Sequence, residues 1–230
     1  MAGADITVVI PAYNERKHIK ETVISLSQES MIREIIVVDD GSADDTYILA
    51  EEAGARVIRL EQNVGKGRAI MAAFPFISSE TVLLLDADLR ASARFALVLA
   101  KPILENKADL TVARFSRGLG GQGFGLVKGF SRLGIKLLTG KYFDAPLSGQ
   151  RCIKKKVLRE LFPLADRFGL EVGMNIDAIR QGYKLIEVDT ALSHCPPGRD
   201  WSGFMHRGEQ LLNICRVLVS RILRQQVMKP

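Results

Sequence analysis

The first half of the chain alternates between short apolar runs and longer segments in which apolar residues recur every three or four positions. Continuous apolar runs are typical of strands buried on both faces of a parallel sheet, and the periodic segments are typical of amphipathic helices. The pattern predicts an α/β fold with a mostly parallel sheet covered by helices on both faces. The predicted strands are Ile6–Ile10, Glu34–Val38, Arg56–Leu60, Thr81–Leu85 and Leu110–Ala113, and the predicted helices are Lys17–Leu26, Thr46–Ala53, Gly65–Phe76 and Phe95–Leu104.

The second half has a weaker pattern and begins with a glycine-rich stretch, residues 118–125. Its spacing predicts one more strand, Lys184–Val188, and four helices, Phe124–Leu138, Val157–Phe162, Val172–Arg180 and Gln210–Val227. No linker rich in Pro, Gly or Ser separates independent domains. We therefore expect one domain with a first half at residues 1–115, a second half at residues 116–208, and a basic amphipathic helical extension at residues 209–230.

The net charge of +6 is divided unevenly along the 230 residues. Residues 1–113 carry 12 Lys and Arg against 17 Asp and Glu, whereas residues 114–230 carry 20 against 9. A division this large suggests that the two halves contact different partners. The basic half is suited to phosphate, nucleic acid or an anionic membrane surface.

The cysteines and the hydropathy pattern bear on the compartment. The three cysteines form neither a CxxC pair nor a zinc pattern, which favours a reducing compartment. The first residues lack a basic segment followed by a long apolar run, and no stretch of 18 apolar residues occurs. We therefore expect neither a signal peptide nor a membrane-spanning helix. The expected location is the cytoplasm, and peripheral contact with the inner face of the cell membrane stays an open alternative.

Asp86-Ala87-Asp88 directly follows a predicted buried strand. Two carboxylates in one turn at the rim of a sheet can hold Mg²⁺ or Mn²⁺, with waters and substrate phosphates completing the coordination. A strand-end turn whose aspartates only cap the next helix is the alternative for such a short motif.

Three further polar motifs follow strands in the same half. Pro11-Ala12-Tyr13-Asn14-Glu15 offers an aromatic ring and a carboxylate to a nucleotide base. Asp39-Asp40-Gly41-Ser42 offers a carboxylate beside a glycine that lets a ligand approach the backbone. Asn63-Val64-Gly65-Lys66-Gly67 places free N–H groups and a lysine at a helix start, which suits phosphate. Each motif alone is also compatible with an ordinary turn.

Together, VVIPAYNE, IIVVDDGSADDT, NVGKGRAI and LLLDADL resemble the nucleotide-binding half of the family 2 glycosyltransferases, which have the GT-A fold. The resemblance implies a nucleotide-diphosphate sugar as donor, with UDP-glucose as the first candidate, and a divalent ion held by Asp86 and Asp88. The residues it implies for nucleotide-sugar binding are Pro11, Ala12, Tyr13, Glu15, Asp40, Gly41, Lys66, Asp86 and Ala87.

The second half is similar to two groups within this family. Asp144 to Arg151 resembles a motif of the polyprenyl- and dolichyl-phosphate sugar synthases, although Gln150 replaces the usual aromatic residue. Pro146 to Gln150, Gly169 to Gly173 and a downstream histidine resemble the glucosyl-3-phosphoglycerate synthases. These resemblances imply His194 as a third metal ligand and Asp88, Glu171 and Arg151 as catalytic residues. A surface histidine and a helix-start carboxylate are the plain alternatives for His194 and Glu171.

The cations of the second half are expected to bind the acceptor. Residues 114–160 hold 11 Lys and Arg against 2 Asp and Glu, with few aromatic residues between them, which argues against nucleic acid. The candidate acceptor or phosphate residues are Arg114, Arg117, Ser148, Gly149, Arg199 and Arg207. The helix predicted at residues 210–227 is suited to a membrane interface, to packing on the domain, or to a second subunit in a homodimer.

The expected function is metal-dependent transfer of a hexose from a nucleotide-diphosphate sugar to a phosphate-bearing acceptor, with a lipid phosphate such as polyprenyl phosphate as the first candidate. Retaining transfer to a small acid such as 3-phosphoglycerate is the alternative. A non-catalytic membrane adaptor that binds nucleotide sugars is the alternative of another class. The pattern does not decide between inversion and retention.

Overall fold

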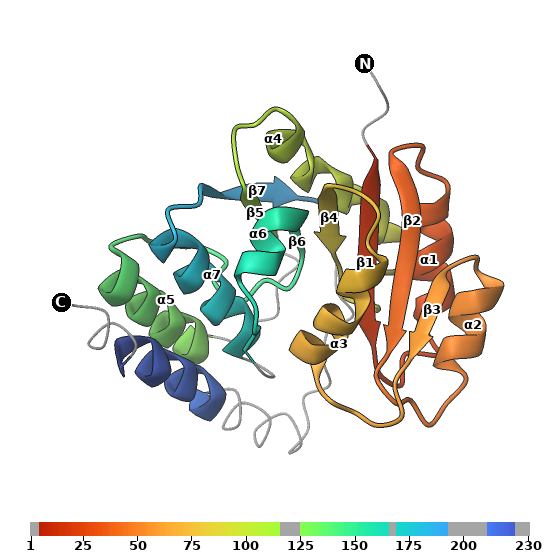
Figure 1. The fold of residues 1–230 in the computed structure, drawn as a ribbon, viewed down its shortest axis with the longest axis horizontal. Coiled ribbons are helices and arrows are strands. Elements are labelled where there is room, and N and C mark those ends of the chain that lie inside the picture. Colours follow the sequence, from red (N-terminus) through yellow and green to blue (C-terminus); the bar gives the residue numbers. More distant parts are fainter. Residues whose placement is uncertain (1–4, 116–124, 166–168, 193–210, 224–230) are drawn as a thin grey trace.

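Seven strands of the described residues form one sheet in the order β3-β2-β1-β4-β6-β5-β7 (Figure 1). The computed structural model describes residues 5–115, 125–165, 169–192 and 211–223. The strands are β1 (Ile6–Ala12), β2 (Ile32–Asp39), β3 (Arg56–Arg59), β4 (Thr81–Leu84), β5 (Leu110–Phe115), β6 (Arg151–Lys154) and β7 (Leu185–Thr190).

The sheet is mostly parallel, as the sequence pattern predicts. Strand β1 runs parallel to β2 and β4, β2 to β3, and β5 to β7. Only β6 among the described strands is antiparallel, and it pairs with both β4 and β5. Strand β6 is not predictable from the sequence pattern, because it has four residues and starts and ends on a cation and so shows no continuous apolar run.

Helices cover both faces of the sheet, because alternate side chains of a strand point to opposite faces. Val8 and Ile10 of β1 pack with residues of α1, α2, η2 and α4, whereas Val9 packs with residues of α3, α6 and α7. The helices are α1 (Ile19–Ser27), α2 (Thr46–Glu52), α3 (Lys66–Ala73), η1 (Phe74–Phe76), η2 (Arg90–Leu99), α4 (Lys101–Leu104), α5 (Gly125–Thr139), α6 (Lys155–Glu160) and α7 (Leu170–Arg180).

Two predicted helices differ from the structure. The single α-helix predicted at Phe95–Leu104 is a 3₁₀ helix, η2, followed by the short α4, and the helix predicted at Gly65–Phe76 ends at Ala73 before the 3₁₀ turn η1. Proline at positions 75 and 102 lies at each of these changes. It has no N–H and cannot continue the hydrogen-bond pattern of an α-helix.

Residues 211–223 form a further helix, here called the C-terminal helix, drawn in blue in Figure 1. This helix lies within the predicted segment 210–227. Its Ile214 and Leu218 share a third core with residues of α5 and α7. No helix in the described part of the chain has the length and apolar character needed to cross a membrane.

Candidate functional site at the carboxyl edge of the sheet

The carboxyl ends of β1, β2 and β4 meet at one edge of the sheet. From β1 the sheet extends to β2 and β3 on one side and to β4 on the other, so the strand order reverses between β1 and β4. Ligands of open α/β sheets bind at such a reversal. Because β6 is antiparallel and Arg151 pairs with Leu84, the start of β6 reaches the same edge.

Three charged side chains meet at this edge from different elements. The Nζ of Lys66, at the start of α3, lies 2.6 Å from the Oδ1 of Asp86 and 3.3 Å from the Oε1 of Glu171. Asp86 follows β4, and Glu171 lies in the first turn of α7. The side chains are 26%, 31% and 13% exposed in that order, so a ligand can still reach all three. All three are predicted site residues, and the structure brings them together.

The charge on Lys66 is stabilised by this arrangement. Burial disfavours the ammonium, but the carboxylates of Asp86 and Glu171 more than offset this effect, so the pKa of Lys66 is raised above its ordinary value. The lysine is therefore protonated over the physiological range. It provides a fixed positive charge where the ends of β1 and β4 separate.

Gly149 and Gln150 complete the surroundings of Asp86. The backbone N–H of Asp86 donates to the Oε1 of Gln150 at 2.9 Å, and the Nε2 of Gln150 donates back to the Asp86 carboxylate. At Gly149, a Cβ atom would lie 2.5 Å from the Nζ of Lys66 and 2.9 Å from the Oδ2 of Asp86. In the sequence Gln150 is only a departure from a motif, whereas the structure shows it orienting Asp86.

Arg151 is buried, with 1% exposure, and its bonds stay inside the protein. Its guanidinium donates to the backbone oxygens of Ser148 and Glu171 and to the Oδ1 of Asn175. Burial lowers its pKa to about 10, against the opposing charges of Glu171 and Asp86, so it is still protonated at neutral pH. We interpret Arg151 as a positioning residue that joins the loop before β6 to α7, rather than as a group that contacts substrate.

Asp40 holds the loop that precedes Lys66. Its two carboxylate oxygens accept the backbone N–H groups of Val64 and Gly65 at 2.8 and 2.9 Å. Gly41 has φ +74°, and a Cβ there would lie 2.6 Å from the backbone of Gln62, so only glycine fits this crossing. The structure thus shows Asp40, a predicted nucleotide residue, placing α3 and its lysine.

The neighbouring Asp39 is a buried carboxylate paired with Arg59. It is fully buried, its Oδ1 accepts the N–H of Ser42, and its Oδ2 has no hydrogen-bond partner. The Nε of Arg59 lies 3.5 Å from that oxygen, and its guanidinium stacks on Tyr47 at 4.1 Å. An open pocket of about 390 Å³ adjoins these groups and is lined by Gly41, Ser42, Arg59, Leu60 and Glu61. Neither Asp39 nor Arg59 was among the predicted site residues.

The segment after β1 faces the same region. Tyr13 is 49% exposed, which leaves its ring available for stacking. The N–H of Glu15 donates to the Oγ1 of Thr46, and its Oε2 lies 2.8 Å from the Nδ1 of His18. Pro11 and Ala12 are the last two residues of β1 and directly precede Tyr13.

The turn after β4 is braced by Thr22, a residue outside the predicted site. The hydroxyl of Thr22 donates to the backbone oxygen of Ala87 and accepts the N–H of Arg90, both at 2.8 Å. Thr22 lies on α1 and is completely buried. A single threonine in a predicted helix carries no signal of such a role, because its partners are 65 and 68 residues away.

Asp86 and the half-buried Asp88 fit a divalent ion that also binds a diphosphate. Carboxylate oxygens are the donors that Mg²⁺ and Mn²⁺ take, and one or two of them are enough when phosphate oxygens complete the coordination. Within the described residues, no three His, Cys, Asp or Glu side chains are grouped to hold a metal ion. The predicted third ligand, His194, lies outside those residues.

The predicted acceptor residues fall into two sets. Arg114 forms a bidentate pair with Asp189 and also contacts Asp144, so it links β5 and β7 instead of standing free. Ser148 is 8% exposed, and its hydroxyl oxygen is buried without a hydrogen-bond partner. Gly149 lies against Lys66 and Asp86, as described above. The other three acceptor candidates, Arg117, Arg199 and Arg207, lie outside the described residues.

Comparison with known proteins defines the class. The family model described as glycosyl transferase family 2 matches residues 7–161, and the chain belongs to this family. Glycosyltransferase AglJ of Haloferax volcanii is 29% identical over 203 residues, which cover 85% of this chain and 65% of that protein. Glucosyl-3-phosphoglycerate synthase of Mycobacterium tuberculosis is 32% identical over 200 residues, 76% of this chain and 61% of that protein. The chain spans less than two thirds of both relatives.

Solved structures show the same likeness. A crystal structure of the M. tuberculosis glucosyl-3-phosphoglycerate synthase with Mn²⁺, UDP and phosphoglyceric acid superposes with a TM-score of 0.81 at 28% identity, covering 96% of this chain and 79% of that one. A shorter match of 95 residues, 40% identical, is to the undecaprenyl-phosphate 4-deoxy-4-formamido-L-arabinose transferase of Serratia proteamaculans, covering 37% of this chain and 29% of that protein. The GT-A fold implied by the motifs is thereby confirmed.

Proposed function

We propose that the protein transfers a hexose from a nucleotide-diphosphate sugar, with UDP-glucose as the first donor, to a phosphate-bearing acceptor. The observation that carries this proposal is the meeting of Lys66, Asp86 and Glu171 where the strand order reverses. One fixed cation and a pair of carboxylates are suited to a diphosphate and the divalent ion that accompanies it. The likeness to a synthase structure that holds Mn²⁺ and UDP supports the same donor.

The donor would lie along the edge from β2 to β4. The ring of Tyr13 and the pocket beside Gly41 would receive the nucleoside. Arg59 lines that pocket and is held by the buried Asp39. The ammonium of Lys66 would contact the diphosphate, since it is charged and already at the edge.

Asp86, Asp88 and His194 would hold Mg²⁺ or Mn²⁺, which when bound stabilises the negative charge of the departing diphosphate. Glu171 would lie on the sugar side, because it belongs to α7 and faces Lys66 from the second half of the chain. Arg151 donates to the backbone oxygens of Ser148 and Glu171. It therefore fixes the position of Glu171 relative to the loop at Gly149.

A lipid phosphate such as polyprenyl phosphate is the first acceptor, and a small acid such as 3-phosphoglycerate is the second. The first is favoured by relatives named for undecaprenyl phosphate and by the basic residues of the second half. The second is favoured by the synthase structures, which cover 96% of this chain and include complexes with phosphoglyceric acid and glycerol 3-phosphate.

The test is UDP release from UDP-glucose in the presence of Mg²⁺ or Mn²⁺, with polyprenyl phosphate in detergent or with 3-phosphoglycerate as acceptor. We expect acceptor-dependent release that EDTA abolishes, and labelled sugar in the organic extract if the acceptor is the lipid. Label only in the aqueous product identifies the small acid. No release with either acceptor, or with other nucleotide sugars, favours a non-catalytic binding protein and contradicts the proposal.

A further inference from the structure

Two neighbouring helices carry an exposed apolar surface that neither the core nor the donor site uses. Every large apolar side chain of the described residues that is more than half exposed lies on α5, the loop just after it or the C-terminal helix. We call this set the outer apolar surface: Leu133, Leu137, Tyr142, Leu212, Val219 and Leu223.

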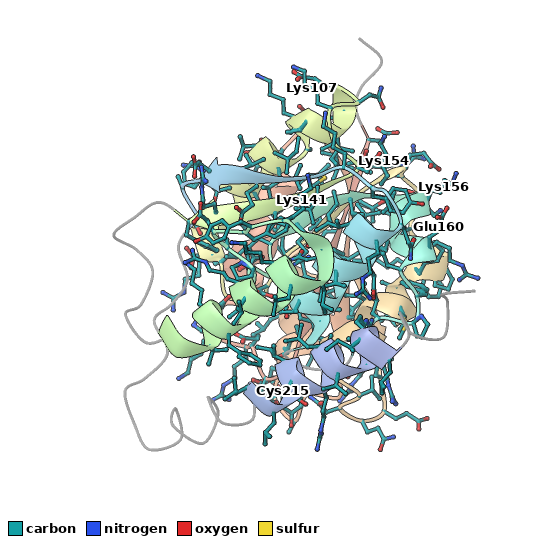
Figure 2. All side chains as sticks on the ribbon, turned by 90° about the vertical axis from the view of Figure 1, so that its left-hand side faces the viewer. Lys107, Lys141, Lys154, Lys156, Glu160 and Cys215 are labelled. Atoms are coloured by element: carbon teal, nitrogen blue, oxygen red, sulfur yellow. The ribbon has the colours of Figure 1, made fainter. Side chains whose placement is uncertain are left out.

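The two helices are in direct contact and their inner residues share one core, so the exposed apolar side chains of both lie on the side away from that core. At Gly134 of α5 an added Cβ would lie 2.5 Å from the Cδ1 of Leu218 on the C-terminal helix. With 100° of rotation per residue, Leu133 and Leu137 lie beside Gly134 on its outward side, and Val219 lies beside Leu218 on its outward side. Figure 2 views this end of the molecule, with the two helices in front and Cys215 labelled on the C-terminal helix.

The C-terminal helix is fastened to the domain by its inner face. Arg221 is 7% exposed and pairs with Asp177 of α7 through two nitrogens, and Arg180 donates to the backbone oxygen of Arg221. Val217 fills the space that Gly169 leaves, since a Cβ there would lie 2.3 Å from its Cγ2. The inner side chains of this helix are therefore explained by contacts that stabilise the fold, whereas its exposed apolar side chains are not.

The two helices themselves carry charge of a single sign, and Asp144, just after Phe143, is paired with Arg114 and Arg132. Residues 125–143 and 211–223 contain no Asp or Glu. Lys136, Lys141 and Arg216 are exposed, and Lys128 is half-buried. We propose that the outer apolar surface, with these cations, docks the protein on an anionic lipid bilayer, where apolar burial and attraction to lipid phosphates act together.

A second copy of the chain is a poorer occupant for the same surface. A two-fold contact would place one cationic, acid-free face against its own copy, and like charges across an interface oppose association. Docking on lipid also does not require sugar transfer, so the two proposals can fail separately.

The experiment is flotation of the full chain with vesicles of phosphatidylcholine containing 30% phosphatidylglycerol, and with phosphatidylcholine alone. We expect binding to the anionic vesicles that weakens with salt, and at least tenfold weaker binding by the combined variant Leu133→Gln, Leu137→Gln, Leu212→Gln and Val219→Gln. A matched control changes four apolar residues of similar chemistry elsewhere on the surface to Gln: Ile24, Ile48, Val98 and Leu104.

Circular dichroism and melting temperature verify that both variants fold, since all eight positions are exposed. A third variant, Lys136→Gln, Lys141→Gln and Arg216→Gln, should lose affinity for anionic vesicles with the apolar residues intact. Equal vesicle binding by the apolar variant and the wild type would overturn the proposal. So would a wild-type dimer in light scattering that the apolar variant converts to a monomer, because the surface would then be a contact between copies.

Discussion

Lys66 carries one positive charge between two carboxylates that are 20 and 105 residues away in sequence. Its neighbours at Gly65 and Gly67 are readable from the sequence as a helix start that suits phosphate. The meeting of Lys66 with Asp86 and Glu171 cannot be read from the sequence, because it depends on which strands are neighbours at this edge of the sheet. Gln150 and Thr22 show the same limit, since each acts on a backbone group of the turn after β4 from a distant segment.

Replacing Lys66 by Met keeps most of the side-chain length and removes the charge. Asp86 and Glu171 then lose the cation that they share, and a bound diphosphate would lose the nearest fixed positive charge. We expect kcat/KM for the donor to fall by about 10²-fold or more in the UDP-release assay. Lys20→Met is the control, because Lys20 pairs with Glu52 on the surface with both side chains about half exposed. Equal activity of the two variants would remove Lys66 from the site.

Gly149→Ala tests how closely the loop before β6 fits the ion pair. The new methyl group would lie 2.5 Å from the Nζ of Lys66, so lysine or loop must move. We expect a loss of about 10- to 10²-fold in kcat/KM, because small displacements of positioning groups have large effects on rate. Gly129→Ala on α5, where a Cβ meets nothing within 4 Å, should leave kinetics unchanged. Wild-type kinetics of the Gly149→Ala variant would show that the exact position of the Lys66–Asp86 ion pair does not matter for the reaction.

At the level of elements, the apolar strands were predictable and the antiparallel β6 was not. Strands β1, β2 and β4 are buried on both faces and therefore read as continuous apolar runs. In β6 the first residue is the buried cation Arg151, which hydropathy places on the surface. Its burial makes sense only once Ser148, Asn175 and Glu171 are seen around it.

Asp109 joins three strands of the second half and provides a pH-dependent test of their packing. Its Oδ1 lies 2.9 Å from the Nζ of Lys154 at the end of β6, and its Oδ2 accepts the N–H of Lys184 beside β7. The N–H of Lys184, with Lys154 adding to the effect against partial burial, holds the pKa of Asp109 below its ordinary value.

A lowered pKa in the folded state means that the charged carboxylate stabilises the fold above the ordinary Asp pKa near 4, and that this stability is lost as the pH falls through the lower folded-state value. Asp109→Asn should lower the free energy of unfolding by about 1 kcal/mol at pH 7, with the difference shrinking below about pH 4. Urea titrations at several pH values measure it. Asp5→Asn, in an exposed pair with Arg33, should change stability less. A constant difference across pH would exclude the ionic contribution.

On the scale of the whole molecule, the uneven charge corresponds to two different surfaces. The acidic first half contributes Asp86 and Asp88 to the edge where β1 and β4 separate. The basic second half provides α5 and the C-terminal helix, which lie at the end of the molecule opposite β3 (Figure 1). Neither helix contains Asp or Glu. The sequence indicates both tendencies, but only the fold shows that the exposed apolar residues lie on two neighbouring helices, because the contact of these helices at Gly134 and Leu218 spans 84 residues.

The central claim is that this edge of the sheet binds a nucleotide-diphosphate sugar together with a divalent ion. Calorimetric titration of the wild type with UDP-glucose, with and without Mn²⁺, tests it most directly, with Asp88→Asn as the matched variant. We predict saturable binding that Mn²⁺ strengthens in the wild type, and loss of that strengthening in the variant. Absence of saturable binding to UDP-glucose, UDP or another nucleotide-diphosphate sugar, with either ion present, would contradict the account.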